Sequence, residues 1–259
     1  MKIVVLVKQV PDSGLERHLS SDFTVDRASA SNVISELDEN AIEAAMALAD
    51  AGQADEVTVL TVGPDHAVET IRKALSMGPD KAVHVQDDAI AGSCAVTTSA
   101  VLAAALGTLE YDLVLCATES TDGAVGGMAQ MLGARLGVAA MTGARKLTVD
   151  GQKLTVERQT EDGHETLTAS TPAVVSVWDS MNTPRYPSLK GIMAAKRKPV
   201  TTLSLSDLGL APDTVGAAGA TSKVVQAEPR PPRSAGQRIT DEGEGGVALA
   251  EYLASQKFV

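Results

Sequence analysis

The residues best suited to bind a ligand lie in a loop rich in glycine and hydroxyl side chains, at residues 117–128. An apolar run ends at Ala117, and the sequence then reads T-E-S-T-D-G-A-V-G-G-M before helical spacing resumes. Glycines let backbone N–H groups come close to a phosphate. A loop between a parallel strand and a helix also ends at a helix N-terminus, where anions are stabilised. The pattern favours phosphate binding, although an ordinary strand–helix connection could use the same residues.

The remaining reactive side chains form no recognisable catalytic or metal-binding pattern. The four histidines are His18, His66, His84 and His164, and none has a cysteine or histidine partner at the spacing of metal ligands. The sequence contains no nucleophile-elbow, zinc-protease or Walker motif. We therefore expect neither a catalytic constellation nor a metal site in this chain.

A second segment of interest is residues 182–198, N-T-P-R-Y-P-S-L-K-G-I-M-A-A-K-R-K. Its apolar residues Leu189, Ile192 and Met193 stand between prolines and a group of cations. Apolar side chains rimmed by charge are typical of protein–protein contacts. Taken alone, the spacing slightly favours the other interpretation, in which these side chains pack into the core of their own chain.

Alternating strands and helices must position both segments. Apolar runs predict strands at residues 2–8, 56–62, 81–85 and 111–117, and helical spacing predicts helices at residues 38–50, 66–77, 94–109 and 128–136. This order predicts right-handed crossovers and a parallel sheet that is covered on both faces. The carboxyl ends of three of these strands would then meet near the glycine loop, where a mononucleotide could be held.

The second half of the chain has a different character. Short β runs at residues 144–149, 154–159, 165–169 and 173–177, separated by Asp-Gly turns, predict an antiparallel extension. A short helix at residues 192–197 and a last strand at residues 200–205 would close an α/β domain that spans residues 1–205. Residues 206–259 read as an extended arm ending in an amphipathic helix at residues 247–255. That helix could dock on another protein or pack on its own domain.

Composition narrows the class of protein. The 259 residues carry a formal net charge of −11, and only 2% are aromatic. The acidic balance argues against binding to nucleic acid, whose phosphates it would repel. The N-terminal apolar run is too short for a signal peptide, and no apolar run could span a bilayer, so we expect a cytoplasmic protein without membrane insertion. Cys94 and Cys116 lie in apolar runs and are expected to be buried free thiols.

Several longer motifs resemble those of electron transfer flavoprotein beta subunits. They include K-I-V-V-L-V-K-Q-V-P-D at the N-terminus, E-T-I-R-K-A-L-S-M-G-P-D-K-A-V-H-V at residues 69–85, the region 156–176, the whole of residues 182–198, and S-A-G-Q-R-I-T-D-E-G near the C-terminus. The similarity follows nearly the whole chain in order. It implies a parallel, doubly wound α/β fold like that of the adenine nucleotide alpha hydrolases.

The resemblance also implies a function. Such subunits form heterodimers with an alpha subunit that holds most of the working FAD, and they bind AMP structurally, or a second FAD in bifurcating members. Electrons arrive from acyl-CoA and related dehydrogenases, as in fatty acid β-oxidation, and leave to a quinone oxidoreductase. Residues 182–198 match the loop that recognises the dehydrogenase, with Leu189 as the docking leucine beside Ile192 and Met193.

By the same resemblance, nucleotide binding falls on sixteen positions: Leu6, Ser35, Glu36, Leu37, Asp38, Val62, Ala117, Thr118, Ser120, Asp122, Gly123, Ala124, Val125, Gly126, Gly127 and Met128. Ser13 and Leu37 match positions near the flavin ring, where relatives can carry aromatic residues. The choice between AMP and a second FAD therefore stays open at this point.

The main alternative is a stand-alone adenine-nucleotide-binding regulator of the universal-stress type, which would share the parallel core and the glycine loop. The β extension, residues 182–198 and the C-terminal arm argue against it, because a compact stress module lacks them. A nucleotide-dependent ligase or hydrolase is a weaker third alternative.

Overall fold

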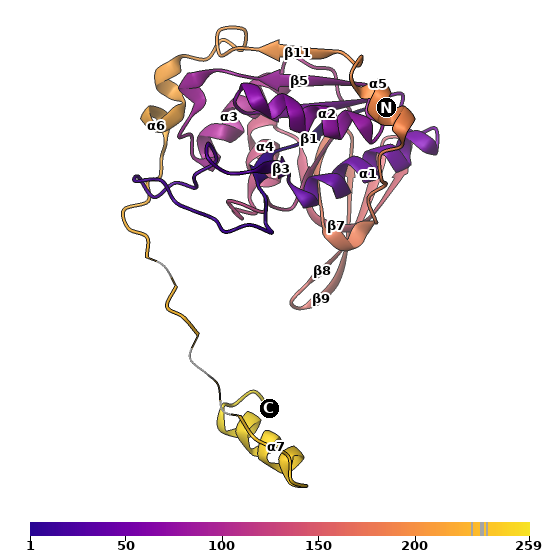
Figure 1. Ribbon diagram of the computed structural model, residues 1–259. Helices are drawn as coiled ribbons and strands as arrows, with labels where there is room; N and C mark the ends of the chain where they lie inside the picture. The colour runs from indigo at the N-terminus through magenta and orange to yellow at the C-terminus, as the bar shows by residue number, and fades with distance from the viewer. Residues whose placement is uncertain (229, 234–235, 237) are drawn as a thin grey trace. The chain divides into compact units, whose positions relative to one another are not determined.

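The computed structural model describes residues 1–228, 230–233, 236 and 238–259 of the chain. These residues form two units, one spanning residues 1–225 and the other residues 226–259. The first unit is built around a nine-stranded sheet with helices on both faces (Figure 1). The domain boundary expected at residue 205 falls inside this unit, because Leu205 and Val215 are both buried in its core.

Seven strands form the parallel part of the sheet. In spatial order they are β11 (Val200–Leu203), β5 (Lys81–Val85), β4 (Glu56–Val62), β1 (Lys2–Leu6), β6 (Leu113–Ala117), β10 (Ala173–Val177) and the first part of β7 (Ala139–Asp150). In the centre, Val4 pairs with Thr58 of β4 and with Val114 of β6. The second part of β7 continues into an antiparallel hairpin with β8 (Lys153–Thr160) and β9 (Gly163–Ser170), which projects from the body in Figure 1.

Helices cover both faces of the parallel strands. The helices α1 (Glu36–Asp50), α2 (Val68–Ser76) and α5 (Leu189–Ala195) contribute buried residues to one core cluster, and α3 (Ala95–Leu106) and α4 (Met128–Leu136) to the other. Strand β1 shows why its sequence is apolar throughout: Ile3 and Val5 enter the first cluster, and Val4 and Leu6 enter the second. The predicted doubly wound α/β class is confirmed.

Short elements complete the first unit. They are β2 (Gln9–Pro11), β3 (Asn32–Ile34), α6 (Gly216–Gly219) and the 3₁₀ turns Asp65–Ala67, Asp88–Ile90, Asp179–Met181 and Pro212–Thr214. Strands β2 and β3 pair antiparallel as a separate two-stranded sheet. This ribbon was not predicted, because residues 11–30 between its strands are polar and show no periodicity.

One sequence-based assignment is wrong. Residues 173–177 do not belong to the antiparallel extension but form β10, which pairs parallel with β6 and with β7. All five residues of β10 are buried, as expected for a strand covered on both faces. A short valine run after two hairpin strands reads as one more hairpin strand, and only the tertiary pairing reveals its return to the core.

The second unit contains the helix α7 (Gly245–Ser255), close to the predicted bounds of 247–255. Its apolar side chains Val247 and Leu249 are exposed. Across the part of the chain that the structure describes, no helix combines the length and apolar content needed to cross a bilayer.

The placement of β10 can be tested by mutation of adjacent valines. Val174 and Val175 point to opposite faces and are both fully buried, in different core clusters. Val174→Ala and Val175→Ala should therefore each lower the free energy of unfolding by about 2 kcal/mol, from lost burial plus a cavity. Thr166→Ala on the exposed strand β9 is the control and should change it by less than about 0.5 kcal/mol. The free energies are measured by urea unfolding. If only one of the two valine variants lowered the free energy of unfolding, the burial of β10 on both faces would be contradicted.

Candidate functional site

A buried carboxylate organises the carboxyl-end edge of the sheet. The side chain of Asp122, in the loop after β6, is 0% exposed and accepts hydrogen bonds from two cations. The Lys8 Nζ lies 2.8 Å from its Oδ1, and the Arg27 Nε and Nη2 lie 2.8 and 2.6 Å from its Oδ2. Burial raises the pKa of Asp122, but the charge and hydrogen bond of Lys8, with help from Arg27, outweigh burial and hold that pKa well below its usual range.

Two cations thus share one carboxylate at this edge, and both remain accessible. The side chains of Lys8 and Arg27 are each 42% exposed, although their partner is fully buried. The cluster keeps one net positive charge, and Ser120 adds a hydroxyl 3.4 Å from the Lys8 Nζ. An anion such as a phosphate would be attracted to this position.

The backbone of the loop supports the same chemistry. Ala124 and Gly126 adopt positive φ values of 46° and 66°, and Gly127, the N-cap residue before α4, provides no side-chain cap. The first N–H groups of an uncapped helix are free to meet an anion. The loop is tied to the sheet at its other end, where the Thr118 N and Oγ1 both donate to the Val177 carbonyl. The predicted loop therefore runs from the carboxyl end of β6 to the start of α4.

The residues before α1 adjoin this lining through Lys8. The Lys8 N donates to the Asp38 Oδ2 over 2.7 Å, and the Ser35 N donates to the Lys8 carbonyl over 3.0 Å. Ser35 is 0% exposed, and its Oγ has no hydrogen-bond partner in the protein. A buried hydroxyl without a partner costs free energy, and a bound ligand would remove that cost. Of the residues predicted here, Glu36 is exposed and accepts from the Ser13 hydroxyl instead.

Asp38 is the second buried carboxyl group at this edge, at 5% exposure. Burial raises its pKa from 3.8 to about 7, because the single backbone hydrogen bond and the charge of Lys8 compensate only in part. The pKa of Asp38 is thus raised and that of Asp122 lowered, since only Asp122 has two cationic partners.

The remaining predicted residues, Leu6, Val62 and Leu37, lie at the same edge of the sheet. Leu6 ends β1 and is buried, and Val62 ends β4 and is half-buried. Leu37 is half-buried at the start of α1. The structure thus places Leu6, Val62 and the loop at residues 117–128 at the carboxyl ends of the adjacent parallel strands β1, β4 and β6. Residues 35–38 lie beside them at the start of α1.

Sequence reasoning missed the two cations. Lys8 is the last residue of the strand predicted at residues 2–8, so its position near the edge could have been inferred from the strand alone. Arg27 lies in the irregular stretch between β2 and β3, and no local pattern marks it. Among the residues that the structure describes, no group of three or more His, Cys, Asp or Glu side chains could hold a metal ion.

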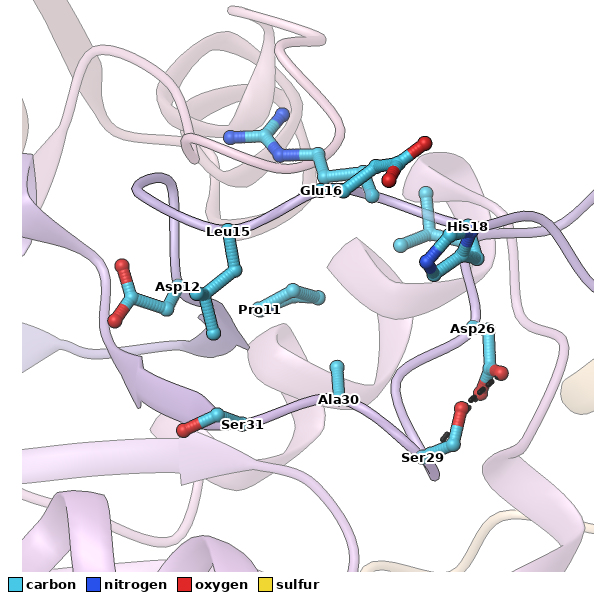
Figure 2. A pocket seen from close by; sticks show the side chains of 11 residues that line it. Pro11, Asp12, Leu15, Glu16, His18, Asp26, Ser29, Ala30 and Ser31 are labelled. Carbon is cyan, nitrogen blue, oxygen red and sulfur yellow. Dashed lines mark hydrogen bonds between the residues drawn. The ribbon is translucent and has the colours of Figure 1, made fainter.

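A cavity of about 210 Å³ lies within the same irregular stretch. Figure 2 shows that Pro11, Leu15 and Ala30 point toward its centre, whereas the Asp12 carboxylate points away. On its rim the Ser29 hydroxyl donates to Asp26. None of the residues predicted to bind a nucleotide lines this cavity, so it is distinct from the strand-end cluster.

Residues 182–198 lie apart from the cluster and expose their apolar side chains. Leu189 is 84% exposed, Met193 66% and Ile192 45%. Packing of these side chains into the chain's own core, which spacing alone slightly favoured, is therefore wrong. The expected helix at residues 192–197 begins earlier, at Leu189, because the Ser188 Oγ caps it by accepting from the Gly191 N.

Known proteins are similar to this chain over nearly its whole length. A family model described as "Electron transfer flavoprotein domain" matches residues 22–208. Proteins named "Electron transfer flavoprotein subunit beta" are 49% identical in Mycobacterium tuberculosis, over 99% of both chains, and 32% identical in Megasphaera elsdenii, over 100% of both. This chain belongs to the electron transfer flavoprotein beta-subunit family. Another relative, "Caffeyl-CoA reductase-Etf complex subunit CarD" of Acetobacterium woodii, is 33% identical over 96% of this chain and 95% of its own.

The opposite pKa shifts of Asp38 and Asp122 predict how the stability of this family member depends on pH. A raised folded-state pKa means that the Asp38 contribution to stability is present below about pH 4 and is lost as pH rises to about 7. Asp38→Asn should therefore raise the free energy of unfolding above pH 7, on the order of 2 kcal/mol, and the gain should fade toward pH 4.

Urea unfolding between pH 4 and pH 8 measures the effect of Asp38→Asn. Asp122→Asn is the matched control, and it should lower stability at pH 7 because it leaves Lys8 and Arg27 without their carboxylate. A gain from Asp38→Asn that did not change with pH would show that Asp38 is not the titrating group.

Proposed function

We propose that this chain is the beta subunit of a cytoplasmic, heterodimeric electron transfer flavoprotein. It accepts electrons from acyl-CoA and related dehydrogenases through an FAD held mainly by the alpha subunit, and it passes them to a quinone oxidoreductase. It binds AMP at the strand-end cluster in a structural role. The observation that carries the proposal is the combination of an accessible cation cluster with a separate, exposed apolar segment.

The strand-end cluster supports a nucleotide monophosphate. Lys8 and Arg27 supply charge for a phosphate, and the uncapped start of α4 supplies N–H groups. The buried Ser35 hydroxyl is available as a partner for a ligand. Because Asp122 already offsets one cation, the remaining positive charge suits one phosphate better than several.

The same edge gives less support to a second FAD. Stacking on an isoalloxazine ring calls for an aromatic side chain, and the positions matched to the flavin neighbourhood carry Ser13 and Leu37. The Acetobacterium relative belongs by name to a caffeyl-CoA reductase complex, so subunits of this kind do join reductase assemblies. A bifurcating subunit with FAD in place of AMP is therefore the second candidate.

We call residues 182–198 the docking segment. Its exposed Leu189, Ile192 and Met193, with Tyr186 at 94% exposure, form an apolar group large enough to anchor a partner. Cations lie among and after these apolar residues in the sequence, at Lys190, Lys196 and Arg197. The proposed occupant is a flavin-containing dehydrogenase that offers an apolar pocket.

The second unit is proposed to dock on the alpha subunit. Its helix α7 exposes Val247, Leu249 and Tyr252. An amphipathic helix after a proline-rich spacer gains stability by burying such residues on another protein. A stand-alone universal-stress regulator is not supported, because relatives named as flavoprotein beta subunits match 99% of this chain.

The docking segment can be tested with Leu189→Ala. Loss of a central apolar anchor should raise the KM of the heterodimer, as electron acceptor of a dehydrogenase, about tenfold, which corresponds to about 1.4 kcal/mol. The fold should be unaffected, because the Leu189 side chain contributes little buried area. Steady-state reduction by a substrate-loaded acyl-CoA dehydrogenase measures this.

Val96→Ala, an exposed valine on α3 and hence on the opposite face of the sheet, is the matched control and should leave KM unchanged. An unchanged KM for Leu189→Ala would remove the docking segment from the electron transfer step.

The nucleotide can be identified directly. We expect heat-denatured heterodimer to release about one equivalent of AMP and one of FAD, and Asp122→Ala to reduce the AMP content, because the loop loses the carboxylate that folds it against Lys8 and Arg27. Chromatography of the supernatant with nucleotide standards gives both amounts. Two equivalents of FAD without AMP would favour the bifurcating alternative, and turnover of added ATP would favour a ligase or hydrolase.

A further inference from the structure

The docking segment is exposed, yet polar side chains anchor it at both ends. At its N-terminal end, Arg185 reaches Glu43 on α1 with its Nε 2.6 Å from Oε2 and its Nη2 2.9 Å from Oε1. The Arg185 backbone N donates to the same carboxylate over 3.1 Å, and its Nη2 also lies 2.9 Å from the Asp50 Oδ2. Glu43 is only 14% exposed, so this is a partly buried, forked ion pair.

A second polar contact stands beside this ion pair. The Asn40 side-chain amide on α1 lies within 3.1 Å of the Asp179 carbonyl and of the Asn182 carbonyl and Oδ1. The Asn182 Nδ2 in turn donates to the Asn40 carbonyl over 3.0 Å. Asn40 is 6% exposed, so these hydrogen bonds are shielded from water. The start of the segment is therefore fixed on one face of α1.

Hydrogen bonds from cationic side chains to backbone carbonyls, in both directions, hold the C-terminal end of the segment on α2. The Arg72 Nη1 on α2 donates to the carbonyls of Ala195 and Lys198, each over 2.7 Å. The Lys198 Nζ donates to the Leu75 carbonyl in the last turn of α2 and to the Gly78 and Pro79 carbonyls just after that helix, over 2.6–3.1 Å. Cations are stabilised at a helix C-terminus, so both contacts favour the observed position of α5 beside α2 (Figure 1).

The middle of the segment approaches α2 closely. A Cβ at Gly191 would lie 2.5 Å from the Ser76 carbonyl oxygen, so only glycine lets α5 pack this near. Ala195, on the same short helix, is 2% exposed. One side of α5 is thus held against the protein, and the opposite side carries the exposed Leu189 and Met193. A segment fixed in this way loses little conformational freedom when a partner binds.

We propose that Arg185 is a positioning residue for docking: through Glu43 it fixes the direction in which the apolar side chains of the docking segment face an incoming dehydrogenase. Arg185 itself need not touch the dehydrogenase. This inference rests on the proposed docking function, and it assigns the pre-formed geometry of the segment to a named side chain. The fork is essential, because a lysine could supply the charge and keep the backbone hydrogen bond but could not reproduce the two guanidinium hydrogen bonds to the Glu43 carboxylate.

The test uses the heterodimer coexpressed with its alpha subunit, in the variants Arg185→Gln, Arg185→Lys, Glu43→Gln and the double variant Arg185→Gln/Glu43→Gln. Their KM and kcat are measured with the dehydrogenase. Arg185→Gln should raise KM about three- to tenfold with kcat unchanged, and Glu43→Gln should do the same. Arg185→Lys should restore KM only in part, and the double variant should be no worse than the singles.

Hydrogen exchange of the free heterodimer supplies the second readout. Amides of residues 182–195 should exchange faster in Arg185→Gln, while those of the sheet should not change. Arg158→Gln is the control, since it removes another arginine–glutamate ion pair, at 2.7 Å from Glu165, between β8 and β9. It should alter neither KM nor exchange in residues 182–195.

Three outcomes would overturn the inference, and they are distinguishable. If Leu189→Ala raises KM but the Arg185 and Glu43 variants do not, docking stands and positioning fails. If KM rises in Arg185→Gln without faster exchange in residues 182–195, Arg185 contacts the dehydrogenase directly. If Leu189→Ala also leaves KM unchanged, the docking function itself fails and the inference fails with it.

Discussion

The carboxyl-end edge of this protein depends on one buried charge, the carboxylate of Asp122. An ionised carboxylate that is withdrawn from water without a partner would cost several kcal/mol, and Lys8 and Arg27 beside Asp122 offset that cost. That requirement draws together three segments far apart in the sequence: the loop after β6, Lys8 just beyond β1, and the stretch before β3. The ion pairs of Asp122 with Lys8 and Arg27 therefore hold the predicted phosphate-binding loop in place without a ligand.

Helix α1 links this edge to the docking segment. Its first turn carries Asp38, which accepts from the Lys8 backbone, and the following turns carry Asn40 and Glu43, which anchor residues 182 and 185. The strand-end cluster and residues 182–198 are thus both held by hydrogen bonds to one helix of the core. In the proposed function, electron transfer between flavins depends on how the carriers are placed, so a shared helix would hold the cluster and the docking segment in one fixed geometry.

Much of this fold could be predicted, and the reasons are local. The strands at residues 56–62 and 81–85 and the helix at residues 128–136 match their predicted bounds, because apolar runs or helical spacing end there at breakers such as Gly63 and Gly137. The return of β10 to the core and the Arg27–Asp122 pair could not be predicted, because both depend on contacts between distant residues. The glycine loop was found from composition, whereas its cations became visible only in the structure.

The central claim is that this chain works as one half of a flavin-carrying pair. Native mass spectrometry of the chain coexpressed with an alpha subunit from the same organism tests it most directly, by giving the composition of the intact assembly. The account predicts a one-to-one complex that carries flavin, and loss of flavin binding when this 26.7 kDa chain is isolated. A chain that remained alone in the presence of the alpha subunit, or that held a full equivalent of flavin by itself, would contradict the account.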